Sequence, residues 1–187
     1  MLSRPDIQKG AEAINRDGLV CYPTEGVFGL GCLPTADKAV ARILEFKHRQ
    51  VEQGLILIAA TLEHLEPWIA PSAVELDRLR SATSIPTTWV ITSSSATPDW
   101  VTGGRNTVAV RVCSHPVAQQ LCLLSASALI STSTNRSGRP AAFNAINARY
   151  RTRNSVDAFV SGTCNPALGA SEIRIATSGK LLRGASS

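Results

Sequence analysis

The chain is arranged around one stretch, Val20-Cys21-Tyr22-Pro23-Thr24-Glu25-Gly26-Val27-Phe28-Gly29-Leu30-Gly31. It begins as an apolar strand, residues 19–22, and Pro23 then removes a backbone donor and ends regular pairing. A hydroxyl and a carboxylate follow, where open α/β sheets present polar groups to ligands. Three glycines permit a tight turn or a close approach of the backbone to a ligand. These residues fit a connecting turn as well as a ligand site.

The length and composition predict a single domain, residues 1–187, because a chain of 187 residues with 44% hydrophobic content can bury a core. No apolar run approaches the roughly 20 residues of a membrane span. The N-terminus lacks the apolar segment of a secretory signal. Five cysteines without a Cys-x-x-Cys pair indicate thiols in a reducing compartment. We therefore expect a cytoplasmic protein without membrane association.

The net charge of +5 is unevenly distributed along the chain. Residues 1–99 carry 9 basic and 12 acidic side chains, whereas residues 100–187 carry 10 and 2. An acid-free stretch between Asp99 and Asp157 contains Arg105, Arg111, Arg136, Arg139, Arg149, Arg151 and Arg153. Such a stretch faces a polyanion or forms a solvated surface. Because arginine suits planar recognition of anions, phosphate binding is favoured for Arg111, and a solvated helix end for the last three.

Hydrophobic periodicity and turn residues predict alternating helices and strands. The expected helices are residues 3–17, 35–46, 61–68, 72–80, 116–124 and 144–150, with Ser3 and Thr35 as N-caps and a capping box at Ser72–Glu75. The expected strands are residues 19–22, 55–60, 87–92, 107–112, 129–133, 156–160, 172–175 and 180–183, and residues 93–106 are expected to form a loop. Because the last two strands have no helix between them, the pattern favours a twisted mixed sheet with helices on its faces.

Two polar segments are candidates for chemistry. Lys47 and Arg49, two positions apart in an extended segment, would project to one side and grip a polyphosphate, or they would simply end a helix. Neither side chain is expected to be buried in the core, and His48 between them is expected at the surface. Residues 131–138 place hydroxyls and an amide at the end of a buried strand, where they bind sugar and phosphate oxygens or satisfy their own turn. The three histidines are scattered, so no nucleophilic triad is indicated.

The stretch at residues 22–31 closely resembles the opening motif of the YrdC/TsaC family, the threonylcarbamoyl-AMP synthases. Residues 47–49, 54–58, 108–111, 131–138 and 171–174 resemble the family's other blocks, in the family's order. The resemblance covers nearly the whole chain. It implies an α/β fold of the YrdC/RibB type, a twisted open mixed sheet with helices on its faces around a concave basic cavity.

The resemblance also implies two sets of binding residues. The ATP-binding set is Lys47, Arg49, Thr107, Ser133, Asn135 and Arg183, with Lys47 and Arg49 as the catalytic pair on the phosphates. The threonine-binding set is Thr24, Arg111, Ser133 and Ser171, and no protein metal ligand is implied. The chain departs from the family at Thr134 and at residues 84–86. Glu25 is open between metal binding, orientation of the amine and capping of a turn.

The implied reaction joins L-threonine, bicarbonate and ATP into threonylcarbamoyl-AMP and pyrophosphate, for the threonylcarbamoyl modification of adenosine 37 in tRNA. Such nucleotidyl transfer depends on positioning and neutralisation of phosphate charge. Mg²⁺ is expected with ATP, held mainly by phosphates and water. Partner proteins of tRNA modification would take the product. The alternative is a structured, double-stranded RNA-binding protein without catalysis, and electrostatic RNA binding is compatible with both functions.

Overall fold

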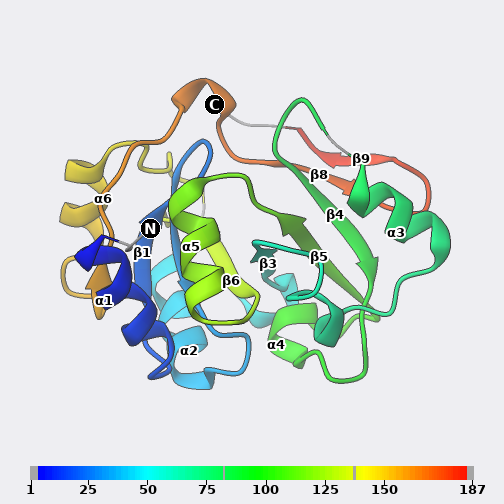
Figure 1. Cartoon of the computed structure of the whole chain (residues 1–187), viewed down its shortest axis with the longest axis horizontal. Helices are drawn as coiled ribbons and strands as arrows, with labels where there is room; N and C mark the ends of the chain where they lie inside the picture. Colours follow the sequence, from blue (N-terminus) through cyan, green and yellow to red (C-terminus); the bar gives the residue numbers. More distant parts are fainter. Residues whose placement is uncertain (1–3, 82, 137, 185–187) are drawn as a thin grey trace.

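The structure is a computed structural model that describes residues 4–81, 83–136 and 138–184. Its described residues form a nine-stranded sheet with the order β7-β1-β2-β6-β3-β5-β4-β8-β9 (Figure 1). The strands are β1 (Val20–Pro23), β2 (Phe28–Cys32), β3 (Ile56–Ala59), β4 (Thr87–Thr92), β5 (Thr107–Val112), β6 (Leu129–Ser133), β7 (Ala158–Phe159), β8 (Glu172–Ile175) and β9 (Leu181–Arg183).

Six α-helices and three short 3-10 helices connect these strands within the described residues. The α-helices are α1 (Pro5–Ile14), α2 (Asp37–Lys47), α3 (Ala73–Arg80), α4 (Asp99–Thr102), α5 (Pro116–Leu124) and α6 (Ala145–Thr152), and the 3-10 helices are η1 (Val51–Gln53), η2 (Glu66–Trp68) and η3 (Pro166–Leu168). None of the helices built from described residues is long and apolar enough to cross a membrane.

The sheet is mixed, as the order of elements predicted. The pairs β1–β7, β3–β5 and β4–β8 are parallel. The pairs β1–β2, β2–β6, β3–β6, β4–β5 and β8–β9 are antiparallel. The capping box at the start of α3 is also confirmed, because Ser72 and Glu75 exchange hydrogen bonds between side chain and backbone.

Strand β2 is the strand that sequence reasoning missed. Its glycines suggested a turn, since glycine is depleted in strands, yet they are required inside the sheet. A Cβ on Gly31 would lie 2.5 Å from the carbonyl oxygen of Ile130 and 2.6 Å from the hydroxyl of Tyr22. Close packing against neighbouring strands therefore explains this glycine, and only residues 24–27 form the turn.

Three other predictions of local structure were wrong. Of the helix expected at residues 61–68, only η2 forms, and α4 lies inside the expected loop at residues 93–106. Helix α2 begins at Asp37 with Ala36 as its N-cap, so Thr35 does not cap it. The expected N-cap Ser3 lies outside the described residues, and Arg4 precedes the first turn of α1 without a capping side-chain bond.

Hydrophobic residues form one cluster on each face of the sheet. Helices α1 and α5 pack on one face with a cluster that includes Ile7, Ile14, Val20, Tyr22, Ile58, Val117, Leu121 and Leu129. Helices α2, α3, α4 and α6 contribute to the larger cluster, which includes Val40, Ile43, Leu57, Leu79, Val101, Val110 and Ala148. Because successive strand residues point to opposite faces, adjacent apolar positions such as Leu57 and Ile58 feed both clusters.

The face under α1 and α5 continues over the neighbouring strands as a polar surface. Arg111 pairs with Ile58, and Ser131 pairs with Ile56, so both polar side chains share the face of these isoleucines. Ser133 lies two residues beyond Ser131 and therefore on this face too. The register of β6, β3 and β5 thus brings together side chains that are far apart in the sequence.

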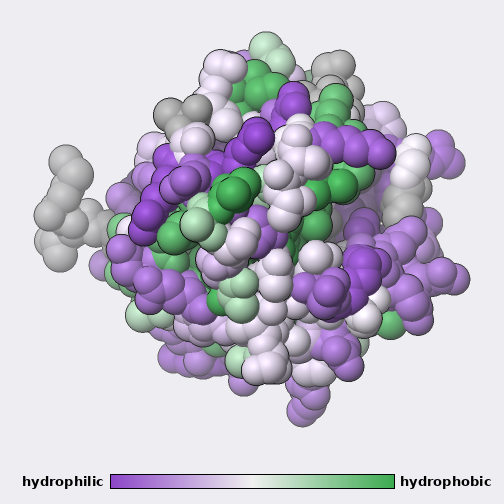
Figure 2. Space-filling model, turned by 90° about the vertical axis from the view of Figure 1, so that its right-hand side faces the viewer, coloured by the Kyte–Doolittle hydropathy of each residue, from purple (hydrophilic) through white to green (hydrophobic). Residues whose placement is uncertain are grey.

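The last strand in the order of the sheet, β9, is a short edge strand. Strand β9 has three exposed residues, and Leu181 and Leu182 are 47% and 54% exposed. Figure 2 views this side of the molecule and shows hydrophobic residues in small patches among hydrophilic ones. A short edge strand limits pairing with another chain.

Candidate active site

The turn between β1 and β2 forms one wall of the candidate site. The backbone N–H and the side-chain hydroxyl of Thr24 both donate to the carbonyl of Val27, at 3.0 and 2.6 Å. A Cβ on Gly26 would lie 1.9 Å from the carbonyl oxygen of Gly169, so only glycine permits this contact between the two segments. The N–H of Asn165 also donates to the carbonyl of Glu25 at 2.8 Å. The turn is therefore held against residues 165–169.

A cavity of about 80 Å³ lies between this turn and the ends of the strands. It is lined by all four residues of the expected threonine set, namely Thr24, Arg111, Ser133 and Ser171, and by Glu25, Ile56, Ser131 and Arg183. The volume exceeds that of one water several-fold, and the lining combines polar and apolar groups. The structure therefore gathers the side chains expected to bind threonine around one space.

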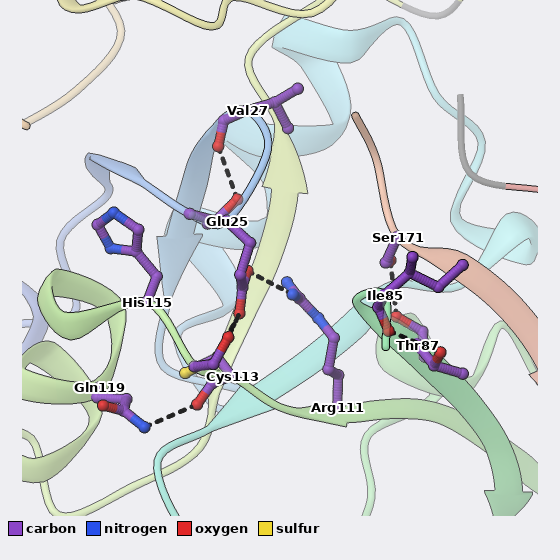
Figure 3. A network of polar contacts seen from close by, with 12 residues as sticks. Glu25, Val27, Ile85, Thr87, Arg111, Cys113, His115, Gln119 and Ser171 are labelled. Carbon is purple, nitrogen blue, oxygen red and sulfur yellow. Dashed lines mark hydrogen bonds and ion pairs between the residues drawn. The ribbon is translucent and has the colours of Figure 1, made fainter. Parts of the chain in front are cut away.

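Arg111 forms a buried ion pair with Glu25. Its Nη1 donates to Oε2 of Glu25 at 2.5 Å, and the two residues are each 8% exposed (Figure 3). Burial alone would raise the pKa of the Glu25 carboxyl, but the charge of Arg111 and the hydrogen bond from the Ser114 N–H outweigh it and lower this pKa below its ordinary value. The Glu25 carboxyl is therefore ionised at neutral pH.

Ser171 and Arg183 close the cavity from the far end of the sheet. The hydroxyls of Ser171 and Thr88 are hydrogen-bonded at 2.8 Å. The Nη2 of Arg183 donates to the carbonyl of Ser171 at 2.9 Å. These bonds join the end of β9 to the segment before β8, so the guanidinium of Arg183 is held at the cavity.

Lys47 is the last residue of α2, and it is buried, with only 3% of its surface exposed. Its Nζ donates to the backbone carbonyls of Ser133 and Asn135, each at 2.8 Å. The expectation that this side chain lies outside the core was wrong, because the ammonium group links the end of α2 to the end of β6. Lys47 thus has a structural role in addition to any role with a ligand.

Arg49 was expected to follow Lys47 in an extended segment. It does not, because His48 between them adopts a left-handed conformation with φ 48°. His48 is exposed, as predicted. The Nη2 of Arg49 donates to the carbonyls of Gln53 and Gly54, at 3.2 and 2.9 Å. Its Nε is buried without a hydrogen-bond partner among the described residues. Lys47 and Arg49 were expected to project to one side, but they contact different segments, Lys47 the end of β6 and Arg49 the residues after η1.

Positive groups near the ends of α2 and β9 contribute to the lowered pKa values of Lys47 and Arg49. Burial, and then the charges of Arg49 and Arg183, lower the pKa of Lys47 to about 8. Burial lowers the pKa of Arg49 as well, followed by the charges of Arg183 and Arg105. No ion pair within residues 4–81, 83–136 and 138–184 includes any of these three arginines. Guanidinium groups that form no ion pair among the described residues suit the binding of an anion.

The remaining residues of the expected ATP set lie in two places. Asn135 is beside Lys47, and its Oδ1 accepts from the hydroxyl of Ser133 at 2.5 Å. Thr107 lies at the start of β5, opposite Thr92, and is not among the described residues that line the cavity. Thr107, four residues before Arg111 on the same strand, therefore lies apart from the threonine set.

The two departures from the family pattern are also located. The hydroxyl of Thr134, which is fully buried, donates to the carbonyl of Phe28 at 3.2 Å. Residues 84–86 line a second cavity of about 520 Å³, together with Glu25 and Arg111. The Thr134 hydroxyl therefore has a partner within the sheet, whereas residues 84–86 border the site.

Comparison with known sequences identifies the family. The sequence model of the Sua5/YciO/YrdC family, described as telomere recombination, matches residues 12–185. The chain belongs to this family. A Vibrio cholerae protein named threonylcarbamoyl-AMP synthase is 41% identical over 181 residues, which cover 95% of this chain and 96% of the relative. A Pseudomonas aeruginosa protein of the same name is 39% identical over 184 residues and covers 98% and 99%. These relatives indicate that this Sua5/YciO/YrdC chain is an enzyme.

Solved structures of the family share the fold. The structure of P. abyssi Sua5 complexed with L-threonine superposes with a TM-score of 0.86 at 32% identity, over 95% of this chain and 53% of that protein. The structure of E. coli YciO superposes with a TM-score of 0.83 at 20% identity, over 95% of this chain and 88% of that protein. The expected α/β fold, a mixed sheet with helices on its faces, is therefore confirmed.

Glu25 is the site residue to which sequence reasoning gave no role. A signal was present, because a buried arginine needs a carboxylate, and Glu25 is an acid that follows the apolar strand expected at residues 19–22. The partner could not be assigned without the strand order, which places β1 and β5 on opposite sides of β2, β6 and β3.

We expect Lys47→Met to lower the free energy of unfolding by about 2 kcal/mol, because two backbone carbonyls would lose a buried donor. The measurement is urea unfolding monitored by circular dichroism. Lys38→Met is the matched control, since Lys38 is exposed on the same helix and should change stability by less than about 0.5 kcal/mol. Equal stability of the two variants would contradict the structural role of Lys47.

Proposed function

We propose that the chain is an L-threonylcarbamoyladenylate synthase, which forms threonylcarbamoyl-AMP and pyrophosphate from L-threonine, bicarbonate and ATP. The observation that carries this proposal is the buried Lys47, which is hydrogen-bonded to Ser133 and Asn135 and lies near enough to Arg49 and Arg183 for their charges to lower its pKa. The names of the relatives support the same reaction. The binding of L-threonine by P. abyssi Sua5 supports the choice of amino acid.

In this proposal the cationic end binds ATP. Arg49 and Arg183 offer guanidinium groups that match phosphate geometry, and Ser133 and Asn135 offer shorter polar contacts. Lys47 adds a positive charge beside the loop after β6, which its hydrogen bonds to the carbonyls of Ser133 and Asn135 hold in place. Because the site is partly desolvated, each positive group acts more strongly on phosphate than it would in water.

The other end of the polar face binds threonine. Arg111 lies on the face shared with Ser131 and Ser133. Through Ile58 it is level with Leu129 of β6, which is four residues before Ser133. Four residues of strand span roughly 13 Å, and the two intervening strand spacings add roughly 10 Å across the sheet. Bound at the two ends, the amino acid and the triphosphate would meet between them, over Ile56 and Ser131.

The proposed chemistry is nucleotidyl transfer. The amine of threonine and bicarbonate form a carbamate with loss of water, and a carbamate oxygen attacks the α-phosphorus of ATP and displaces pyrophosphate. Positioning and neutralisation of phosphate charge supply most of the catalysis in such transfers, without a protein nucleophile. Mg²⁺ is proposed to accompany ATP, held mainly by phosphate and water oxygens.

The product is proposed to serve the threonylcarbamoyl modification of adenosine 37 in tRNA. Threonylcarbamoyl-AMP is a mixed anhydride, and partner proteins of tRNA modification would take it before water hydrolyses it. This role places the proposed reaction in the cytoplasm, where tRNA, ATP and threonine are present.

The proposal is tested by pyrophosphate release. We expect the purified protein to release pyrophosphate from ATP only when L-threonine and bicarbonate are both present, because the attacking carbamate needs both. A coupled pyrophosphate assay measures this directly. Release that is independent of threonine, or equal with L-serine, would contradict the assigned reaction.

Two variants locate the phosphate site within the same assay. Arg49→Ala should reduce turnover by roughly a hundredfold, the usual effect of losing one positive donor on developing charge. His48→Ala is the matched control, because His48 is exposed and adjacent to Arg49. Near-normal turnover of Arg49→Ala would place the phosphates elsewhere.

The binding of ATP should depend on pH through Lys47. Its pKa is lowered to about 8, so the charged form is lost as the pH rises through 8. Because ATP needs the charged form, its dissociation constant should increase roughly tenfold between pH 7 and pH 9. Calorimetric titrations at a series of pH values measure this. Lys47→Met should bind ATP weakly and without this pH dependence, and a flat profile for the unaltered protein would contradict the role of Lys47.

A second candidate function is electrostatic binding of double-stranded RNA. A groove of about 830 Å³ is lined by Arg42, Arg136, Arg139, Arg151, Arg153 and His48, with Glu45 as its acid among the described residues. Arg42 is paired with Asp157, whereas Arg136 and Arg139 take part in no ion pair between described residues. A groove with several arginines attracts a phosphate backbone without reading its sequence.

RNA binding through this groove should be sensitive to salt. The affinity for an RNA duplex should fall by at least about tenfold between 50 and 200 mM salt, because counterions are released when two or more phosphates are neutralised. Fluorescence anisotropy with two unrelated duplex sequences measures the effect. An affinity that is independent of salt, or that an Arg136→Ala, Arg139→Ala double variant retains in full, would exclude this function.

A further inference from the structure

The side chain of Glu25 helps to line the cavity of about 80 Å³. It is the only acidic side chain among the described residues that line this cavity. Glu25 and Arg111 also line the neighbouring cavity of about 520 Å³, so the ion pair stands between the two spaces. A charged pair at a boundary between two cavities can act on a ligand in either of them.

The carboxylate of Glu25 is held in place by groups other than Arg111. Its Oε1 accepts from the backbone N–H of Ser114 at 2.8 Å and lies 3.4 Å from the Ser114 hydroxyl. The backbone carbonyl of Glu25 accepts from Asn165, on the segment across the cavity. Figure 3 shows Glu25 between Arg111 and the segment that follows Cys113. Because these contacts involve backbone groups, the position of the carboxylate is fixed by the fold.

Arg111 has hydrogen-bonding capacity that the protein does not use. A guanidinium carries five N–H donors, and the described hydrogen bonds of Arg111 use Nη1 alone. Its Nε is buried and has no hydrogen-bond partner among the described residues. Leaving a buried donor without a partner is unfavourable, so an acceptor from a ligand would satisfy it. A carboxylate that binds side-on to a guanidinium uses such a second N–H.

We infer that Glu25 is a positioning residue, which holds Nη1 of Arg111 so that the remaining N–H groups, Nε included, receive the carboxylate of the amino-acid substrate. This inference rests on the proposed function, since it names the ligand of Arg111 as the carboxylate of threonine. The two carboxylates then share one guanidinium, with Glu25 as the permanent partner and the substrate as the exchangeable one.

Competition between Glu25 and the substrate carboxylate is the opposite arrangement. It would require Glu25 to leave Arg111 when the substrate arrives, yet its contacts with Ser114 and Asn165 oppose such a movement. Arg111 also does not need Glu25 to leave, because free donors remain. The two arrangements predict opposite effects of removing the Glu25 charge, since loss of a competitor would strengthen binding of the substrate.

The test compares two ligands in the Glu25→Gln variant. L-threonine carries the carboxylate, whereas L-threoninamide differs only in having a neutral amide there. Calorimetric titration of the full chain should show that Glu25→Gln raises the dissociation constant of L-threonine at least tenfold. The constant for L-threoninamide should change less than twofold, because this ligand does not engage the charged guanidinium. A merely structural role would weaken both ligands to the same extent.

Further variants keep the test decisive. The dissociation constant of ATP without threonine should stay within twofold in Glu25→Gln, which shows that the variant is folded. If Glu25→Gln does not fold, Glu25→Asp keeps the charge, withdraws it from Arg111, and should reproduce the selective loss of threonine affinity. Ser114→Ala removes only the hydroxyl and should have a smaller effect, since the backbone N–H remains.

Unchanged or stronger binding of threonine by Glu25→Gln would overturn the positioning role, and so would equal weakening of threonine and threoninamide. These results would leave the proposed reaction intact, because they concern the orientation of Arg111 alone. Failure of the unaltered protein to bind L-threonine at all would instead overturn the proposed function, and the inference with it.

Discussion

The ammonium group of Lys47 joins the end of α2 to the loop after β6, and the candidate site depends on this link. Two backbone carbonyls, of Ser133 and Asn135, converge on Nζ at 2.8 Å. Carbonyls that point at one buried cation fix the path of the loop, because no water replaces the donor there. The side chains of Ser133 and Asn135 are thereby held beside Lys47, whose pKa is lowered by burial and by the charges of Arg49 and Arg183.

One polar face of the mixed sheet carries two regions that suit different anions. At the cationic end, arginines lie without carboxylate partners among the described residues, which suits a polyanion. At the other end, Arg111 is already paired with Glu25, which suits a single carboxylate better than a triphosphate. The division follows from the register, because Ser133 pairs with Gly29 at the start of β2 and lies four residues along the sheet from the row of Arg111.

The sequence predicted those parts of the fold whose signals are local. Strands β4, β5 and β6 and helix α5 have the predicted bounds, because alternation, flanking turns and Pro116 mark them. Strand β2 was not predicted, since its glycines serve contacts with other strands that no local pattern reveals. The threonine set was placed together by resemblance and is found around one cavity. The burial of Lys47 and the partner of Arg111 depend on strand order, which lies beyond local patterns.

The central claim is that one polar face binds a triphosphate at the Lys47–Arg183 end and an amino acid at the Arg111 end. A crystal structure of the protein with L-threonine and a non-hydrolysable ATP analogue tests it most directly. The account predicts phosphate oxygens within hydrogen-bonding distance of Arg49 and Arg183, and the threonine carboxylate on Arg111 with the Glu25 pair intact. A triphosphate bound in the arginine groove beside α6, or an amino acid bound away from Arg111, would contradict it.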